Sequence, residues 1–343
     1  MAPIGPPNGA KAVSMLAHKI SGTVGALALA LAGTVLSHAE AASWPQRPVT
    51  VIVPYAAGGM ADIIARLVSH HLSRKLGQPF IVDNHGGGAG AIGAIQVANA
   101  PQDGTVLMFT SPSAILTVPM LQRVPYEPAS FVPISIVANL PFILGIKSSL
   151  PPKTLADFID YAHANPGKLN YASAGVGGIS HLVSSLFVKK AGIDAVHVPY
   201  KSAAPATAAL LTGEVDMNFG GAPELMQHLN SNRITILATS SANRLPNLPN
   251  TPTISELYPG FEVNTWLGFV APRGTPQDII DAMAGATEET VGISAVAERL
   301  LSLGAVPVGS IPMEFAVVLM RDRALYRDAI KSAGIPLAEE KQR

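Results

Sequence analysis

Short apolar runs of strand length alternate along this chain with segments whose apolar residues recur at helical spacing. The runs that predict strands cover residues 49–54, 80–82, 106–110, 142–146, 169–173, 196–199, 215–219, 234–239 and 266–270. Helices are predicted after the first strand as far as Gly77 and at about residues 154–163, 179–191, 205–211, 222–229, 276–285 and 312–333. This alternation is typical of βαβ units, so we predict an α/β fold whose mostly parallel sheets are flanked by helices.

The first predicted strand runs into a glycine turn that opens directly into a helix. The turn consists of Tyr55, Ala56, Ala57, Gly58 and Gly59. Glycine has no Cβ atom, so the backbone can turn sharply and approach another molecule closely. The first N–H groups of the helix have no partner inside it, and the helix dipole adds positive charge there. The segment therefore predicts a site for a carboxylate or a phosphate, although an ordinary βα turn has the same pattern.

The middle of the chain repeats this strand–turn–helix pattern. Ser173 ends a predicted strand, the turn contains Ala174, Gly175 and Gly177, and a helix begins at about Ile179. Ligands of open α/β sheets bind at the carboxyl ends of strands, where such turns collect. Two turns of this kind therefore suggest two lobes that face one ligand-binding cleft.

Small and polar residues also follow other predicted strands. Ser111 and Ser113 follow the strand at 106–110, Tyr200 and Ser202 follow the strand at 196–199, and Gly220 follows the strand at 215–219. These positions predict a cleft rim of hydroxyl and backbone groups. Residue types that perform catalysis are nearly absent from this rim.

Two further residues of the turns are candidates for ligand contact. Asp62 lies in the first turn of its helix, where a carboxylate is favoured by the dipole. It could instead hold the turn in shape or meet an ammonium group of a ligand. His181 could point into the cleft, or it could be a packed or helix-capping histidine.

A literal GxGxxG, GAGAIG at residues 88–93, would suggest a dinucleotide site. It follows the second predicted strand rather than the first, and no acidic residue stands about 20 positions further on at a strand end. We therefore expect a structural or cleft-edge turn and no cofactor.

Enzyme and metal signatures are missing as well. The sequence has no GxSxG, and Ser180 and His181 are neighbours whose side chains diverge on a helix. His70 and His71 are also adjacent, which is not a metal-ligand spacing. The sequence thus favours a protein that is not an enzyme and holds no metal; an exported hydrolase or isomerase of a carboxylate is the rival class.

The N-terminal segment has the pattern of a secretory signal peptide. Lys11 and Lys19 precede an uncharged apolar run over residues 20–36, and small residues at 37–41 offer cleavage after Ala41. The alternative is an uncleaved membrane anchor, because the run approaches the length that spans a bilayer. We predict residues 1–41 to be a signal peptide and the mature chain to be periplasmic.

The composition narrows the possible partners. The chain has no cysteine, which rules out disulfides and thiol catalysis. Its 23 basic and 23 acidic residues balance, and no basic run is interleaved with aromatic residues. Nucleic acid is therefore not an expected partner.

At this point the motifs carry a resemblance to a family. They are PQRP at 45–48, VIVPYAAGG at 51–59, LGQP at 76–79, GAGAIGA at 88–94, PQDG at 101–104, YASAG at 171–175, GISHL at 178–182, VPYK at 198–201, LTGEVD at 211–216, LPNTPT at 248–253, WLGF at 266–269, GTP at 274–276 and AGI at 333–335. In this order they resemble the substrate-binding proteins of tripartite tricarboxylate transporters, the Bug family. The resemblance covers essentially the whole mature chain.

The resemblance implies a two-lobed periplasmic binding protein of the type II, Venus-flytrap class, with two crossing strands as its hinge. It implies that main-chain groups and bridging waters of the two glycine turns hold a ligand carboxylate. The family usually has a small hydroxyl residue where this chain has Ala61 and a glycine where it has Ser202, and often an acidic residue near Gly220. These departures affect the distal half of the pocket.

We therefore predict an exported monomer without catalytic activity that captures a small carboxylate, either an organic acid or an amino acid. The first lobe is predicted at residues 44–141 plus 265–343, and the second at 142–264. The resemblance implies delivery to a membrane permease, and a ligand sensor for a membrane signalling protein is the alternative. The sequence does not identify the carboxylate.

Overall fold

A computed structural model describes residues 1–2 and 44–340 of the chain. Nearly all of the predicted signal peptide lies outside the described residues, and its assignment stays a prediction. Trp44–Arg343 forms one compact unit, which is described here by itself. Among the described residues, no helix has both the length and the apolar character that crossing a bilayer requires.

The described unit alternates strands and helices almost throughout. Its strands are β1 (Val49–Val53), β2 (Phe80–Asn84), β3 (Val106–Thr110), β4 (Phe131–Lys147), β5 (Leu169–Ser173), β6 (Ala195–Pro199), β7 (Met217–Gly221), β8 (Ile234–Thr239), β9 (Asn264–Pro272) and β10 (Val306–Pro307). Its α-helices are α2 (Met60–Leu76), α3 (Ala91–Ala98), α4 (Val118–Leu121), α5 (Leu155–Ala164), α6 (Ile179–Ala191), α7 (Ala203–Thr212), α8 (Ala222–Met226), α9 (Gln277–Gly292), α10 (Ser294–Ser302) and α11 (Pro312–Ser332). Short turns of other helix types are η1 (Gly88–Gly90), η2 (Ser113–Thr117), η3 (Pro128–Ser130) and η4 (Ile254–Glu256).

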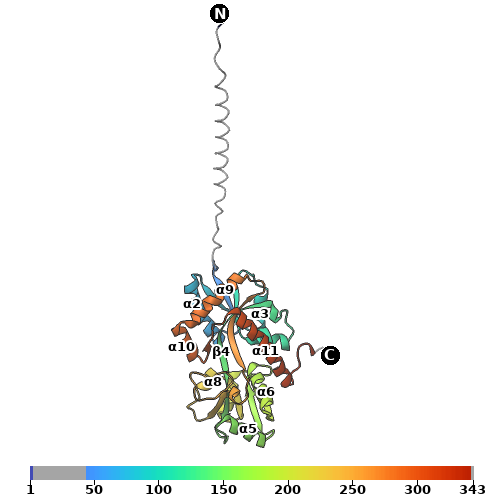
Figure 1. The fold of residues 1–343 in the computed structure, drawn as a ribbon. Coiled ribbons are helices and arrows are strands. Elements are labelled where there is room, and N and C mark those ends of the chain that lie inside the picture. Colours follow the sequence, from blue (N-terminus) through green and yellow to red (C-terminus); the bar gives the residue numbers. More distant parts are fainter. Residues whose placement is uncertain (3–43, 341–343) are drawn as a thin grey trace. The chain divides into compact units, whose positions relative to one another are not determined.

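One long strand, β4, belongs to both halves of the sheet. The strand order is β2-β1-β3-β9-β4-β7-β5-β6, with β8 and β10 also pairing with β4. Residues 131–141 of β4 pair with β9, and residues 142–146 pair with β7. β4 and β9 therefore run between the elements around α2, α3 and α9 and those around α5, α6 and α8 (Figure 1).

The sheet is mixed rather than mostly parallel. β1 pairs in parallel with β2 and β3, and β5 pairs in parallel with β6 and β7, as the alternating pattern predicted. β4 and β9 run antiparallel to each other, and each is antiparallel to a parallel strand at its side. The predicted lobe boundaries at 141/142 and 264/265 stay predictions.

The helices begin and end where the residue types favour it. Gly77 caps α2 in the left-handed conformation, with φ 71°, and its N–H donates to Ser73 O. The side chain of Thr154 caps α5 by accepting a bond from Asp157 N. The buried face of α2 packs on β1 with Ile64, Val68 and other apolar residues, whereas Ile63 is exposed although it belongs to the predicted stripe.

Most predicted elements agree with the structure to within a few residues, and the differences are local. β4 begins eleven residues before the predicted strand at 142–146. α9 continues to Gly292 instead of ending at 285, and α8 ends at Met226 instead of 229.

Candidate functional site

A cavity of about 240 Å³ opens where the two halves of the sheet meet. Met60, the first residue of α2, borders it from one half of the fold. Ala174 after β5, the strand β7 and the starts of α6, α7 and α8 border it from the other. The crossing strands β4 and β9 contribute Leu140, Phe142 and Thr265. The cavity therefore lies at the carboxyl ends of β5 and β7, the edge where ligands of such sheets bind.

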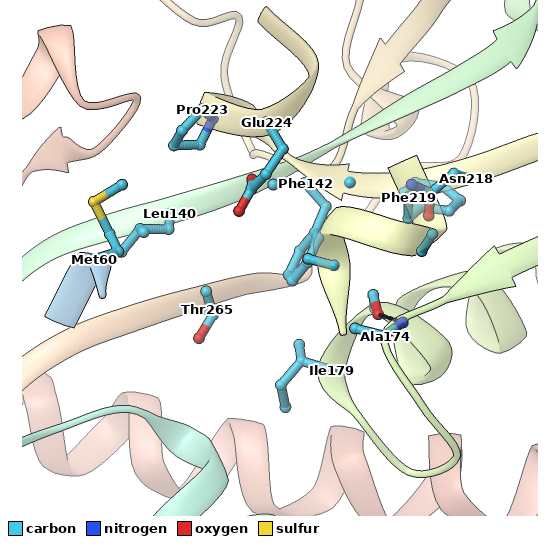
Figure 2. Close-up of a pocket in the computed structure, with 15 residues that line it drawn as sticks. Met60, Leu140, Phe142, Ala174, Ile179, Asn218, Phe219, Pro223, Glu224 and Thr265 are labelled. Carbon is cyan, nitrogen blue, oxygen red and sulfur yellow. Dashed lines mark hydrogen bonds between the residues drawn. The ribbon is translucent and has the colours of Figure 1, made fainter. Parts of the chain in front are cut away.

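The wall of the cavity is largely apolar. Phe142 and Phe219 form part of it and are themselves buried. Polar groups come from Ser180, Asn218, Glu224 and Thr265, and Figure 2 shows the side chain of Glu224 directed into the cavity from α8. An apolar chamber with a few polar groups is typical of a small-molecule site.

Side-chain hydrogen bonds hold the first glycine turn in shape. Asp62 Oδ2 accepts a bond from Gly58 N at 2.8 Å, and Asp62 Oδ1 accepts one from Arg66 Nε at 2.8 Å. Arg66 Nη2 donates to Asn84 Oδ1, and Asn84 Nδ2 donates to Tyr55 O, which joins the turn to the end of β2. Gly58 has φ +80°, a conformation that favours glycine.

The second glycine turn is held by residues of α6 and β6. Gly177 N donates to His181 Nδ1 at 3.1 Å, and Ala174 N donates to Ser180 Oγ at 3.0 Å. The His181 ring stacks on the His197 ring with centroids 3.7 Å apart, and His197 Nε2 lies 2.7 Å from Ser173 Oγ. Burial, and then the neighbouring His197, lower the pKa of His181 to about 4, so this ring is neutral at pH 7 and can accept the bond.

Several N–H groups of the two turns already have partners inside the protein. Besides Gly58, Ala174 and Gly177, Gly175 N donates to Ser173 Oγ and Gly178 N donates to Gly175 O. The N–H groups of the first helical turns of α2 and α6 have no partner inside their helices. Met60, Ile179 and Ser180 of those turns line the cavity, so the N–H groups beside it that the helices leave unpaired belong to the helix openings rather than to the glycines.

Comparison with known proteins identifies the family. The model of the tripartite tricarboxylate transporter family receptor matches residues 64–316. The chain belongs to this family.

Relatives of this receptor cover nearly its whole length. Protein BugT of Bordetella pertussis is 33% identical over 313 residues, which cover 90% of this chain and 96% of BugT. The structure of R. palustris Rpa4515 with adipate has a TM-score of 0.72 at 34% identity and covers 86% of this chain and 99% of that one. MatC of Rhodopseudomonas palustris with bound malate has a TM-score of 0.68 at 31% identity and covers 84% of this chain and 100% of MatC. These likenesses agree with the two-lobed α/β architecture that the sequence predicted.

The structure brings only part of the predicted site to the cavity of this receptor. Ala174 and Gly220 line it, and Ser202 and His181 stand next to the lining residues Ala203 and Ser180. The first turn reaches the cavity through Met60, which follows Gly59. Tyr55, Ala56, Ala57, Gly58, Gly59, Asp62, Ser173, Gly175 and Gly177 are not among the lining residues, and their contact with a ligand stays a prediction.

Four predicted site residues form hydrogen bonds within the protein through their hydroxyl groups. Tyr55 Oη lies 2.6 Å from Ser111 Oγ, and Ser113 Oγ donates to Ala89 O. Tyr200 Oη donates to Glu214 Oε1 at 2.6 Å. Burial and the Glu214 carboxylate raise the pKa of Tyr200 to about 12. These bonds stiffen the loops beside the cavity, and ligand contact by Ser111, Ser113 and Tyr200 stays a prediction.

The sequence did not single out several residues that line the cavity. Phe142 and Thr265 lie on the crossing strands, and their proximity depends on how β4 and β9 pair. Glu224 has a local signal, because it follows Gly220 and Gly221 at the start of a predicted helix. The direction of its side chain into the cavity is set by the short helix α8.

The GAGAIG segment has a packing role in this receptor. A Cβ atom at Gly93 would lie 2.8 Å from Pro54 Cβ, and one at Gly90 would lie 2.7 Å from Ala114 Cβ. The glycines therefore allow α3 and η1 to approach the end of β1 and the start of η2 closely, which accounts for the glycine spacing without a dinucleotide.

Proposed function

We propose that this receptor is an exported solute-binding protein that captures a small carboxylate in the cavity between its two lobes. The single observation that carries the proposal is the convergence of two helix openings on one largely apolar cavity, at Met60 of α2 and Ile179 of α6. Helix N-termini attract anions, and apolar walls suit the carbon skeleton of an organic acid. Membership of a receptor family supports a binding role rather than catalysis.

The ligand carboxylate would accept hydrogen bonds from both helix openings. Ser180 can add a donor, because its Oγ accepts the bond from Ala174 N and its hydroxyl hydrogen remains available. Main-chain groups of the Tyr55–Gly59 turn would contribute directly or through water. A ligand bound in this way joins both lobes, so we propose that binding favours the closed state.

The remaining parts of the proposal concern the cellular context. The N-terminal pattern supports export, and the family supports delivery of the ligand by a monomer to a membrane permease. Pull-down from membranes with the tagged mature chain tests the partner. Recovery of permease subunits supports transport, whereas recovery of a signalling protein alone would favour a sensor.

Ligand binding is tested first by a thermal-shift screen of the mature chain against monocarboxylates, dicarboxylates, tricarboxylates, amino acids and NAD. A ligand at about 100 times its dissociation constant stabilises the folded state by roughly 2.7 kcal/mol. This corresponds to a rise of several degrees at about 2–4 °C per kcal/mol for a protein of this size. A shift with NAD and none with any carboxylate would contradict the proposal.

A substitution in either glycine turn should abolish binding. In Gly59→Val, the new side chain projects beside the helix opening and blocks the approach of the carboxylate; its Cβ would lie 3.3 Å from Ala56 O, which requires only a small adjustment. Gly177→Val is the second variant, but Gly177 has φ +77° and its Cβ would lie 2.8 Å from Leu121 Cδ1. Gly59→Val therefore tests binding with less strain on the fold.

The matched control is Gly285→Val in α9, where a Cβ atom meets nothing within 4 Å. Isothermal titration should detect no binding to Gly59→Val and unchanged binding to Gly285→Val. Normal binding by both turn variants would show that the carboxylate site is elsewhere.

A further inference from the structure

Glu224 is an acid that lines the largely apolar cavity. Its Oε2 atom is buried and accepts no hydrogen bond from the part of the chain that the structure describes. Leaving a carboxylate oxygen buried and unpaired is costly, because the oxygen loses its water without gaining a donor. The Oε2 atom itself rests against Gly221, and the Glu224 side chain lines the cavity, so a bound molecule would meet this carboxylate there.

The backbone beside Glu224 leaves room for this carboxylate. A Cβ atom at Gly221 would overlap Glu224 Oε2, so the glycine lets the acid rest against the chain at the end of β7. In Figure 2 the Glu224 side chain points from α8 toward the space bordered by Thr265 and Ile179. The acid thus faces the same chamber as the helix opening of α6.

Among the cavity residues that the structure describes, no positive side chain balances Glu224. Among the described residues that line the cavity there is no arginine, lysine or histidine. A dicarboxylate such as adipate or malate, which are bound in two similar structures, would bring a second anion into a chamber with an acid and no cation. A group that carries positive charge would instead pair with Glu224.

From this arrangement we propose that the ligand is a carboxylate that also carries a protonated amine, and that Glu224 accepts the hydrogen bond from the amine. The inference rests on the proposed function and adds the chemical class of the ligand. The carboxylate binds at the helix openings, the hydrocarbon part packs on Phe142 and Phe219, and the ammonium group donates to the Glu224 carboxylate. A hydroxyl group could also donate, but it would leave the charge of Glu224 without a counter-ion.

The test compares ligands that differ in one group only, by isothermal titration at neutral pH. The probes are ε-aminocaproate, caproate and adipate; γ-aminobutyrate, butyrate and succinate; and leucine with isocaproate. At least one amine should bind about tenfold to hundredfold more tightly than its unsubstituted partner, as expected for a hydrogen bond between charged groups. The corresponding dicarboxylate should bind more weakly than the amine. Adding the hydroxy acid of the same length separates a hydroxyl donor from an ammonium donor.

The substitution Glu224→Gln keeps the size of the side chain and removes its charge. It should weaken binding of the preferred amine about tenfold or more and leave the affinity for the corresponding acid without the amine unchanged. Glu298→Gln, at an exposed position in α10, is the control and should change neither. Equal loss of affinity for both partners would show that Glu224 acts only on the shape of the cavity, and would overturn the inference.

The outcomes separate this inference from the proposed function. Binding of caproate or adipate without any preference for an amine would overturn the role of Glu224 and leave the carboxylate receptor intact. Tighter binding of the hydroxy acid than of the amine would also overturn it. Absence of binding by every carboxylate of the panel would overturn both.

Discussion

At the scale of single residues, a buried histidine, His181, and a half-buried one, His197, support the second glycine turn. His181 is 3% exposed, and its ring stacks on His197 with centroids 3.7 Å apart, while the Tyr171 ring stacks on His197 at 5.0 Å. Its Nδ1 atom accepts the bond from Gly177 N, which a protonated Nδ1 could not do. The turn in this conformation therefore requires neutral His181.

This arrangement predicts that stability falls as the pH falls. The pKa of His181 is lowered from its usual 6.5 to about 4, and burial lowers the pKa of His197 as well. A lowered pKa means that the unfolded chain binds protons first, so the stabilisation is complete above about pH 6.5 and is lost as the pH falls toward 4. For His181 alone the loss in the free energy of unfolding is on the order of 3 kcal/mol.

Urea unfolding between pH 4 and pH 8 measures this loss. His181→Asn removes one titrating ring, so the difference between the native protein and the variant should shrink as the pH falls. A difference that stays constant over this range would contradict the assignment. The comparison uses the slope with pH, because the variant also changes the stability at neutral pH.

At the scale of secondary-structure elements, the start of α2 is joined to its turn by one acid. Asp62 is buried and bonds both Gly58 N and Arg66 Nε. The sequence left open whether Asp62 serves only the helix dipole or also holds the turn. The two hydrogen bonds show that it holds the turn.

Asp62→Ala should therefore lower the free energy of unfolding by about 1–3 kcal/mol, because it removes two hydrogen bonds of a charged group. It should also weaken carboxylate binding, because the helix opening loses its fixed position. The control is Asp278→Ala, an exposed acid in the first turn of α9, which should cost at most about 1 kcal/mol through the dipole alone. If both substitutions lower the melting temperature equally, Asp62 stabilises the protein only through its interaction with the helix dipole.

The bounds of the helices and strands show how far the sequence predicts the structure. Elements with an unbroken apolar run or a clear glycine end, such as β3, β8 and α6, agree with their predicted bounds. The first part of β4 was missed because Pro133, Ser135 and Asn139 interrupt its apolar pattern. The register of β4 on β9 shifts between Pro133 and Ser135 and again between Ile136 and Ala138, and such bulges break the alternation of faces.

The sequence could predict the part of the site that depends on local structure, and not the part that depends on strand pairing. A glycine turn before a helix is a local feature, so the approach to the cavity could be located from the sequence. Glu224 and Phe142 line the same cavity because β4 pairs with β7, and nothing local in the sequence encodes that pairing. The residues to which we assign ligand selectivity in our proposal are therefore among those that the sequence pattern missed.

At the scale of the whole described unit, β4 is shared by both halves of the sheet. Its residues pair with β9 and β10 on one side of the junction and with β7 and β8 on the other. α11 also contacts both halves, because it packs on β4 and α6 and because Asp322 accepts a bond from Trp266 Nε1 at 2.9 Å. Neither half can lose its structure without exposing a strand of the other.

This sharing predicts that the mature protein unfolds in one cooperative transition. Scanning calorimetry should give a single peak whose calorimetric enthalpy equals the van't Hoff enthalpy, as in a two-state protein. Two resolved peaks would show that the lobes are independent folding units. Saturating ligand should move the whole peak to higher temperature without splitting it.

The position of Trp266 gives this receptor a built-in optical reporter. The chain has two tryptophans, and Trp44 packs against Phe80, outside the lining of the cavity. Trp266 follows the lining residue Thr265 on β9, and its indole ring packs on Phe315 with centroids 4.7 Å apart. In a Trp44→Phe protein, all tryptophan emission would therefore come from a strand that joins the two lobes. Rapid mixing of this protein with a ligand would then measure the rate of ligand binding from tryptophan fluorescence, without an attached dye.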